Sequence, residues 1–281
     1  MGARHPPRRR RGFTLVEILV VVVILGLIMS MAAVLLRSVT ATQKRSVTGT
    51  RLANIDAALV QFVMQQRRLP CPADGTQPPS TGGDEARPAS GTCNANEMNG
   101  VIPWKTLGLA ASDATDGWDR RITYRVDKSL TADDGMNLSW CDPAGTGGLA
   151  GGACNNTCTS AALASCTPPA TYLTGKGLNV KNLAAVDVML PGGAPPTGAA
   201  YVLISHGESG GGAYLDTGQV STSTVTDGTE EQKNYANLAL QAYYVDDQST
   251  DVGGTAHFDD IVVRPSVLAV ASKAGLGPRA H

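Results

Sequence analysis

A single carboxylate interrupts an otherwise apolar stretch near the N-terminus. Glu17 lies in the run FTLVEILVVVVILGLIMSMAAVLL, whose other polar residues are Thr14 and Ser30. A charged group at the centre of a membrane helix costs about 2.5–3.5 kcal/mol, so such a group usually marks a function or a partner. A carboxylate in apolar surroundings needs a cationic partner, which predicts that Glu17 forms an ion pair. The alternative is a glutamate that reaches the membrane interface and has no role.

A second segment formally fits the nucleophile elbow of a serine hydrolase. Residues 207–211 (GESGG) have the G-x-S-x-G spacing and follow a predicted strand. In that interpretation Ser209 is the nucleophile, His257 is the base, and the acid comes from Asp246, Asp247 or Asp251. An elbow requires a helix directly after the serine, whereas the sequence GGAYLDTG does not favour one. We therefore interpret the segment as a glycine-rich turn, with the hydrolase as an alternative.

The apolar stretch that carries Glu17 predicts a membrane-spanning helix. From Ile18 to Leu36 there are 19 residues, and Ser30 is the only polar one. A helix of this length spans about 28 Å, close to the hydrocarbon thickness of a bilayer. Five arginines lie within residues 1–12. The excess of positive charge on that side predicts an N-terminus in the cytoplasm and a single-pass orientation.

The helix is predicted to continue beyond the membrane as an amphipathic segment over residues 37–69. One face of a 3.6-residue period carries Leu52, Ile55, Leu59, Phe62 and Val63. Gly49 is a candidate bend, and Pro70 and Pro72 end the pattern. An unbroken helix from Phe13 to Arg68 would be about 84 Å long.

The remainder, residues 70–281, is predicted to be a loop-rich extracytoplasmic domain of the α+β class. Two segments are expected to be long loops: residues 71–100, which are rich in Gly and Pro, and residues 142–171, which are rich in Gly and Cys. Strands are predicted at Arg121–Val126, Ala200–Ser205 and Phe258–Val263.

Charge is divided unevenly along the chain. The formal net charge is −1, but residues 13–281 carry 18 Lys and Arg against 24 Asp and Glu, a net charge of −6. With 42% hydrophobic residues the chain is not a disordered protein. The pI near 6.4 argues against nucleic acid as the main partner.

Six cysteines follow the apolar stretch: Cys71, Cys93, Cys141, Cys154, Cys158 and Cys166. An even number on the oxidising side of a membrane predicts disulfides, for which fifteen pairings are possible. We favour Cys71–Cys93 closing the first loop, with the other four paired among themselves in the second. The alternative is a zinc site of four thiolates at Cys154-X3-Cys158, but the spacing is longer than the usual CxxC and no histidine lies nearby.

The run Arg11–Glu17 (RGFTLVE) resembles the cleavage and methylation signal of type IV pilins and type II secretion pseudopilins. The resemblance implies that a prepilin peptidase cuts the Gly12–Phe13 bond and methylates the new amine of Phe13. It also implies that residues 1–12 are a leader peptide and that 13–36 form a transmembrane and filament-core helix. In that family the carboxylate at the position of Glu17 pairs with the N-terminal amine of the neighbouring subunit.

Three later segments resemble the major pseudopilins of the same family. Residues 116–124 (DGWDRRITY) resemble the start of a strand, although Asp119 stands where the family has glycine. Residues 205–211 and 259–262 resemble a glycine-rich turn and an acidic end that fold around calcium in many relatives. The resemblance implies a calcium site with ligands from Ser205, Glu208, Asp259 and Asp260, and the sequence indicates no certain cofactor. The alternative is that these acidic residues are simply solvated.

These observations predict a structural, non-enzymatic subunit of a type II secretion pseudopilus or a type IV pilus. A mature chain of 269 residues with two long loops favours a minor subunit. The expected partners are prepilin peptidase, other pilin or pseudopilin subunits, the inner-membrane assembly platform and lipid, with no nucleic acid. We expect the precursor in the bacterial inner membrane with its C-terminal domain in the periplasm, and the mature chain in the filament. The alternative is an exported periplasmic enzyme, hydrolase-like, with a twin-arginine-type signal at residues 10–13.

Overall fold

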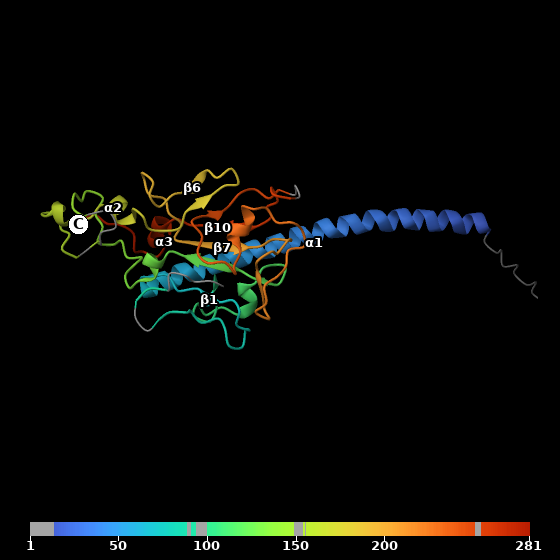
Figure 1. Cartoon of the computed structure of the whole chain (residues 1–281), viewed down its shortest axis with the longest axis horizontal. Coiled ribbons are helices and arrows are strands. Elements are labelled where there is room, and N and C mark those ends of the chain that lie inside the picture. The colour runs from blue at the N-terminus through green and yellow to red at the C-terminus, as the bar shows by residue number, and fades with distance from the viewer. Residues whose placement is uncertain (1–13, 89–90, 94–99, 149–153, 155, 251–253) are drawn as a thin grey trace, which may run out of the picture. The chain divides into compact units, whose positions relative to one another are not determined.

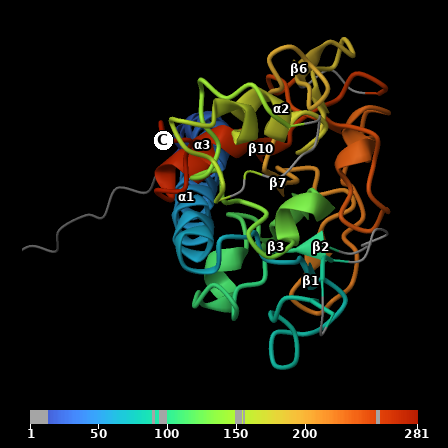
Figure 2. The ribbon, with the colours of Figure 1, turned by 90° about the vertical axis from the view of Figure 1, so that its left-hand side faces the viewer.

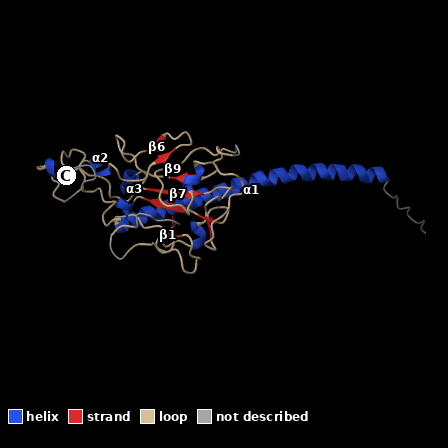
Figure 3. Ribbon diagram, viewed as in Figure 1, coloured by secondary structure: helices blue, strands red, loops and turns tan. Residues whose placement is uncertain are grey.

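The chain divides into two compact units, Met1–Gln43 and Lys44–His281. The computed structural model describes residues 14–88, 91–93, 100–148, 154, 156–250 and 254–281, with the backbone alone for 31–38. Figure 1 shows the order of the elements along the chain, which begins with one long helix and continues with short strands. Loops make up much of the second unit (Figure 3).

Helix α1 (Leu15–Gln66) is continuous over 52 residues and belongs in part to each unit. The helix is unbroken from Leu15 to Gln66, and the candidate bend at Gly49 does not interrupt it. The helix ends where Arg67 takes a left-handed φ of 56°, three residues before Pro70. In the first unit, every large apolar side chain described between Leu15 and Met29 is at least 50% exposed.

No helix among the described residues is long and apolar enough to cross a membrane. The membrane-spanning first half of α1 therefore stays a prediction.

The second unit contains an antiparallel sheet of five strands in the order β1-β2-β4-β7-β10. The strands are β1 (Ala73–Asp74), β2 (Gly100–Val101), β4 (Thr123–Val126), β7 (Tyr201–Ser205) and β10 (Ile261–Val263). Strand β7 is an interior strand that pairs with β4 on one side and β10 on the other, and all five of its residues are buried. Its register places Ser205 opposite Ile261. The antiparallel pairing of β7 and β10 therefore brings the end of β7 next to the start of β10.

Smaller sheets and helices surround this sheet. One pairs β3 (Arg120–Arg121) with β8 (Tyr214–Leu215), and another has the order β6-β5-β9, with β5 and β9 parallel. Their bounds are β5 (Val180–Lys181), β6 (Asp187–Met189) and β9 (Tyr244–Val245). Two short α-helices, α2 (Pro169–Leu173) and α3 (Val267–Lys273), and four 3-10 turns complete the described secondary structure. The 3-10 turns span Ala111–Ala114, Lys128–Thr131, Leu163–Ser165 and Glu231–Asn234.

The second half of α1 packs on the sheet through its apolar face. Leu52, Ile55, Leu59 and Val63 are at most 1% exposed and share one core with residues of β4, β7 and α3. Figure 2 shows α3 lying beside this part of α1. Asp56 fixes the contact, because its carboxylate accepts hydrogen bonds from Tyr201 (2.6 Å) and Lys273 (3.1 Å).

Phe62 departs from the predicted buried face. Its ring is half-buried, and the Arg68 guanidinium lies 5.0 Å from the ring centroid. The helical period placed Phe62 at the edge of the apolar face, where a cation–π contact replaces core packing.

Two of the three predicted strands are shorter than their patterns. The first divides at Ile122 into β3 and β4, which pair in different sheets. The third is a strand only over Ile261–Val263. Phe258 pairs instead with Thr250, outside the five-stranded sheet, and the two aspartates between Phe258 and β10 are buried. The predicted strand at Ala200–Ser205 forms as β7.

Three disulfides close the long loops: Cys71–Cys93, Cys141–Cys154 and Cys158–Cys166. The preferred pairing of Cys71 with Cys93 and the pairing of the other four among themselves are both present. The alternative of a thiolate zinc site at the last four cysteines is wrong, because all four are oxidised in pairs. A disulfide stabilises the fold mainly by restricting the unfolded chain, which suits segments with few apolar side chains.

A buried ion pair anchors the first loop to the end of α1. Arg68 donates two parallel hydrogen bonds to Glu85, 2.8 Å to Oε2 and 2.6 Å to Oε1, and the Cys71 backbone N–H donates a third at 2.9 Å. Burial acts to raise the pKa of Glu85, but the hydrogen bonds and charge of Arg68 outweigh it and hold the pKa below its usual value. The Arg68 side chain is only 7% exposed.

Replacing Glu85 with glutamine should lower the free energy of unfolding at pH 7 by about 1–3 kcal/mol, since a buried guanidinium loses its charged acceptor. Because the folded-state pKa is lowered, the stabilisation is complete above the ordinary pKa near 4.5 and is lost as pH falls through the folded-state value. Urea unfolding of the oxidised full chain in detergent at pH 7 and pH 3 measures the difference between E85Q and wild type.

The control is Asp133. Its carboxylate pairs with Arg87, which lies in the same loop as Glu85, at an N–O distance of 2.7 Å, but the Asp133 side chain is 81% exposed. D133N should change the unfolding free energy much less than E85Q. A difference between E85Q and wild type that stays constant or grows towards pH 3 would contradict the assignment.

Candidate functional site

The first candidate site is the start of α1, where Thr14 and Glu17 form a capping box. The Thr14 backbone N–H and hydroxyl donate to Glu17 Oε2 at 3.0 and 3.1 Å, and the Glu17 N–H lies 3.3 Å from the Thr14 hydroxyl oxygen. These reciprocal bonds satisfy donors that the first turn of a helix leaves open. The T-x-x-E spacing is the sequence signature of this motif, and our sequence interpretation of Glu17 missed it.

The cap leaves part of the Glu17 carboxylate available. Both bonds from Thr14 fall on Oε2, and among the described residues no hydrogen bond or ion pair reaches Oε1. One carboxylate can therefore cap its own helix and accept a second donor. The predicted processing residues Gly12 and Phe13 lie outside the described residues, so their roles stay predictions.

The second candidate site lies where the glycine-rich turn after β7 meets the chain before β10. Gly207 has a φ of +52°, and a Cβ there would lie 2.3 Å from the Asp259 carbonyl oxygen. Only glycine allows the two segments to approach this closely. Arg120 holds the turn by donating to the carbonyl oxygens of Gly207 (2.6 Å) and Glu208 (3.2 Å).

Three carboxylates meet at this junction, and we call Glu231, Asp259 and Asp260 the acidic cluster. One oxygen from each lies within 4.8 Å of the others, and the residues are only 1–5% exposed. Glu231 comes from the 3-10 turn Glu231–Asn234, and the two aspartates precede β10. The cluster therefore joins segments that are about 30 residues apart in sequence.

A shell of donors orients these carboxylates. Ser209 donates to Asp259 through its backbone N–H (2.7 Å) and its hydroxyl (2.8 Å), and Asn234 donates to Asp260 Oδ2 at 2.8 Å. The Asp259 N–H donates to Glu231 Oε1 at 3.0 Å. Asp259 and Asp260 are thus fixed by groups outside the cluster, and Glu231 by the backbone of Asp259.

Two histidines border the cluster in different environments. His257 Nδ1 lies 2.9 Å from Glu231 Oε2, and Asp227 joins these two in a second group with ligand atoms within 4.8 Å. His206 is 1% exposed, its Nε2 lies 2.8 Å from the Thr123 hydroxyl, and its Nδ1 faces Asp260 Oδ1 at 3.6 Å. That distance is too long for a hydrogen bond.

Burial and the neighbouring charges shift the pKa values of several groups in and around the acidic cluster. Burial, followed by the charge of Glu231, raises the pKa of Asp260 well above its ordinary value, and burial also raises the pKa of Glu231. Burial lowers the pKa of His206 to about 3, so its imidazole is neutral. Burial acts to lower the pKa of His257, but the hydrogen bond to Glu231 raises it overall. Burial thus favours the protonated forms of Glu231 and Asp260.

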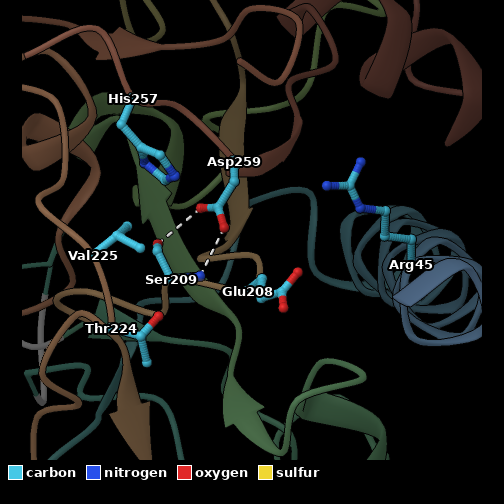
Figure 4. A pocket seen from close by; sticks show the side chains of 7 residues that line it. All are labelled: Arg45, Glu208, Ser209, Thr224, Val225, His257 and Asp259. Carbon is cyan, nitrogen blue, oxygen red and sulfur yellow. Dashed lines mark hydrogen bonds between the residues drawn. The ribbon is translucent and has the colours of Figure 1, made fainter. Parts of the chain in front are cut away.

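A pocket gives solvent access to one side of the cluster. It is lined by Arg45, Glu208, Ser209, Thr224, Val225, His257 and Asp259. In Figure 4 Ser209 and its hydrogen bonds to Asp259 lie at the centre of the pocket, whereas the Glu208 carboxylate points away from them.

The predicted calcium ligands are only partly brought together. Asp259 and Asp260 lie in the acidic cluster, but the Ser205 hydroxyl donates to Asp116 Oδ2 at 2.7 Å, and Glu208 is an exposed residue at the pocket rim. Calcium binding stays a prediction. Sequence reasoning missed Glu231 and His206, because no motif links residues from three separate segments.

The described residues do not have the arrangement that a serine hydrolase requires. A turn rather than a helix follows Ser209, and the serine hydroxyl donates to Asp259 instead of His257. Asp246 pairs with Arg264 and Asp247 accepts from the Leu183 N–H, so neither orients His257. The third proposed acid, Asp251, lies outside the described residues.

Comparison with known proteins addresses the N-terminal site. Residues 7–33 match the family described as the prokaryotic N-terminal methylation motif. The chain carries a prepilin-type signal of the type IV pilin and pseudopilin kind. This signal marks a substrate of prepilin peptidase and indicates a structural subunit. No curated protein and no solved structure matches the chain. The match ends at residue 33, so the likeness of the later segments to major pseudopilins stays a prediction.

Proposed function

We propose that this chain is a minor structural subunit of a type II secretion pseudopilus or a type IV pilus. The carrying observation is the methylation motif at 7–33, which runs directly into the 52-residue helix α1. A signal of this kind is useful only if the apolar helix behind it is retained after cleavage. The buried residues that pack α1 on the sheet support this retention, since the second half of the helix is part of the folded domain.

In this proposal the precursor waits in the inner membrane with residues 1–12 in the cytoplasm and the second unit in the periplasm. Peptidase cleavage after Gly12 releases the basic leader and creates the amine of Phe13. Assembly then exchanges lipid around Ile18–Leu36 for helices of neighbouring subunits. Lipid tails are about as apolar as leucine, so the exchange changes the free energy little and the ion pair of Glu17 sets the register.

The proposal of a minor subunit rests on the size of the second unit. Residues 44–281 carry long loops closed by three disulfides. Such loops would crowd the lateral surface of a filament built mostly from this chain. A filament grows by a contact that does not close on itself, and a bulky subunit is accommodated best where few copies are needed.

Mass spectrometry of the chain purified from membranes tests the proposal. The expected N-terminus is N-methylated Phe13. An N-terminus within or after the region 31–33 would instead identify ordinary signal cleavage and an exported protein, which would overturn the proposal.

A further inference from the structure

We propose that a pocket beside α2 binds a hexuronic acid, which is a sugar that carries a carboxylate. The sugar ring would pack on the indole of Trp140, and its carboxylate would pair with the ammonium of Lys176. The site adds a small-molecule ligand to the folded second unit. It goes beyond the proposed function and does not depend on filament assembly.

The pocket lies at the end of the second unit where α1 stops. Its volume is about 460 Å³, within the range of about 300–1,000 Å³ that small-ligand sites occupy. Its walls include Arg67, which follows α1, residues from 129 to 140, and Tyr172 on α2. Figure 1 shows α2 at the same end of the second unit as the C-terminal end of the chain. Because these segments are far apart in sequence, only the folded unit forms the pocket.

Trp140 offers a ligand a flat apolar surface at this pocket. Its side chain is among the exposed large apolar groups, at 39%, and it lines the pocket. The His281 ring stacks on the indole with centroids 5.2 Å apart and an interplanar angle of 14°. His281 is itself held, since its Nε2 lies 2.8 Å from the Ser139 carbonyl oxygen. A rigid, amphipathic aromatic ring binds at a low cost in conformational entropy, and the C–H face of a sugar ring can pack on it.

Lys176 provides a positive charge without a partner. Its Nζ lies 3.2 Å from the centroid of the Tyr172 ring, and among the described residues it forms no ion pair or hydrogen bond. The carboxylate of Asp127 acts on it from a distance but already accepts from Ser129 and from the Gly177 N–H (2.9 Å). Burial lowers the pKa of Lys176 to about 8. An anion beside this partly buried amine would stabilise its charged form.

The other charged side chains that line the pocket are already paired. Arg67 lies 3.5 Å from Asp134, and Asp133 lies 2.7 Å from Arg87. The opposite side of Lys176 supplies no counter-charge, because it lines a smaller pocket whose other described walls are apolar or neutral. The ligand that balances the first pocket therefore carries one negative charge.

Polar groups between these two anchors suit the hydroxyls of a sugar. One N–H of the Asn137 amide donates to Asp134 at 3.3 Å, and within the described structure the other N–H has no acceptor. Asp133 pairs with Arg87 through Oδ1 and is otherwise exposed. A hydroxyl both donates and accepts, so it can bond to a carboxylate oxygen and an amide N–H at once. A small anion without hydroxyls would leave these groups to water.

Saturation-transfer NMR on the oxidised full chain in detergent at pH 7 tests the proposal. The probes are D-glucuronate, D-galacturonate, their neutral counterparts D-glucose and D-galactose, and acetate. At least one of the two acids should bind about 10-fold or more tighter than its neutral counterpart and than acetate, because it alone engages both Trp140 and Lys176. Binding by neither acid, or equal binding of the neutral sugar or of acetate, would overturn the proposal.

Two variants separate the contributions of the ring and the charge. K176M should weaken binding of the acid by at least about 10-fold and leave the neutral sugar unchanged, whereas W140A should weaken both by about 10-fold. Both changes affect partly exposed side chains, so each variant should keep the wild-type Tm. Undiminished binding of the acid by either variant would contradict the site.

Lys181→Met is the matched control. Lys181 also faces a tyrosine ring, that of Tyr243 at 5.0 Å, but it pairs with Asp187 at 3.5 Å and does not line the pocket. K181M should therefore change the affinity for the acid by less than about twofold. An effect as large as that of K176M would mean that the overall charge of the protein, and not the pocket, attracts the ligand.

The pH dependence gives a second measurement on the wild-type chain. Because the pKa of Lys176 is lowered to about 8, its charge is lost as pH rises through and above this value, while the uronate stays ionised. Burial raises the pKa of Tyr172 to about 12, so its hydroxyl stays neutral. The remaining charged groups near Lys176 are carboxylates and a guanidinium, which do not titrate between pH 7 and pH 10: Asp127, Asp134 and Arg67. The affinity should fall by at least about 10-fold over this range in wild type and stay constant in K176M. A wild-type affinity that does not change would overturn the proposal.

Discussion

Replacing Gly12 with aspartate is expected to leave the whole chain as an uncut precursor in the membrane. The resemblance of residues 11–17 to a prepilin-type signal predicts that the scissile bond lies between Gly12 and Phe13. A peptidase must approach this bond closely, and glycine has no Cβ to obstruct the approach. Aspartate adds both bulk and a negative charge beside the four consecutive arginines at 8–11 of the predicted leader. We expect processed chain to fall by at least about 100-fold.

Intact-mass analysis of the membrane fraction measures the ratio of precursor to mature chain. The matched control is Gly26→Ala, which changes a glycine in α1 where an added Cβ meets no other atom within 4 Å. Alanine also favours the helix, so G26A should be cut as efficiently as wild type. Normal processing of the aspartate variant at position 12 would show that another bond is cleaved and would remove the pilin interpretation.

Local patterns were sufficient to predict the features that depend on short stretches of sequence. The period of Leu52, Ile55, Leu59 and Val63 correctly identified the face of α1 that packs on the sheet, because helical geometry alone determines which side chains share a face. The pairing of Cys71 with Cys93 followed from the loop between them. These inferences needed no knowledge of the rest of the fold.

Features that join distant segments were not predictable in the same way. Glu231 lies in a polar stretch with no motif, and only the turn at Gly207 and the approach of Asp259 give it a role. His206 follows β7 and reads as an ordinary polar residue until the register of β7 and β10 places it opposite Asp260. Register depends on the complete set of strand pairs, which a single sequence does not specify.

Asp119 is an intermediate case, because the sequence identified the position as unusual but only the structure shows its backbone conformation. Asp119 stands where the major pseudopilins that this segment resembles have glycine, and its φ is 62°. Glycine takes left-handed conformations without strain, and aspartate is among the few other residues that do so readily. The substitution is therefore compatible with the same turn, with Asp116 accepting the backbone N–H groups of Trp118 (2.8 Å) and Arg120 (3.0 Å) around it.

The final prediction concerns Glu17, which caps its own helix in the structure and has a second, predicted role in assembly. As a cap it accepts from Thr14, and as a predicted assembly residue it pairs with the Phe13 amine of the next subunit. Glutamine serves in a capping box as glutamate does, but it carries no charge. E17Q should therefore be cut normally and keep the start of α1, yet its incorporation into filaments should fall by at least about tenfold, because the amine loses its counter-charge.

Thr14→Ala is the complementary variant, because it removes the side chain of the cap and keeps the carboxylate. Loss of the N-cap hydroxyl destabilises the helix start by about 1 kcal/mol, while Glu17 remains able to pair. Co-expression of each variant with the wild-type chain, followed by quantification in sheared filaments and in membranes, separates the roles. Strong incorporation of E17Q together with exclusion of T14A would mean that Glu17 acts only within its own helix, and that another contact sets the subunit register. Exclusion of E17Q together with strong incorporation of T14A would show that assembly needs the negative charge of Glu17, since glutamine can replace glutamate in the cap but not in the ion pair.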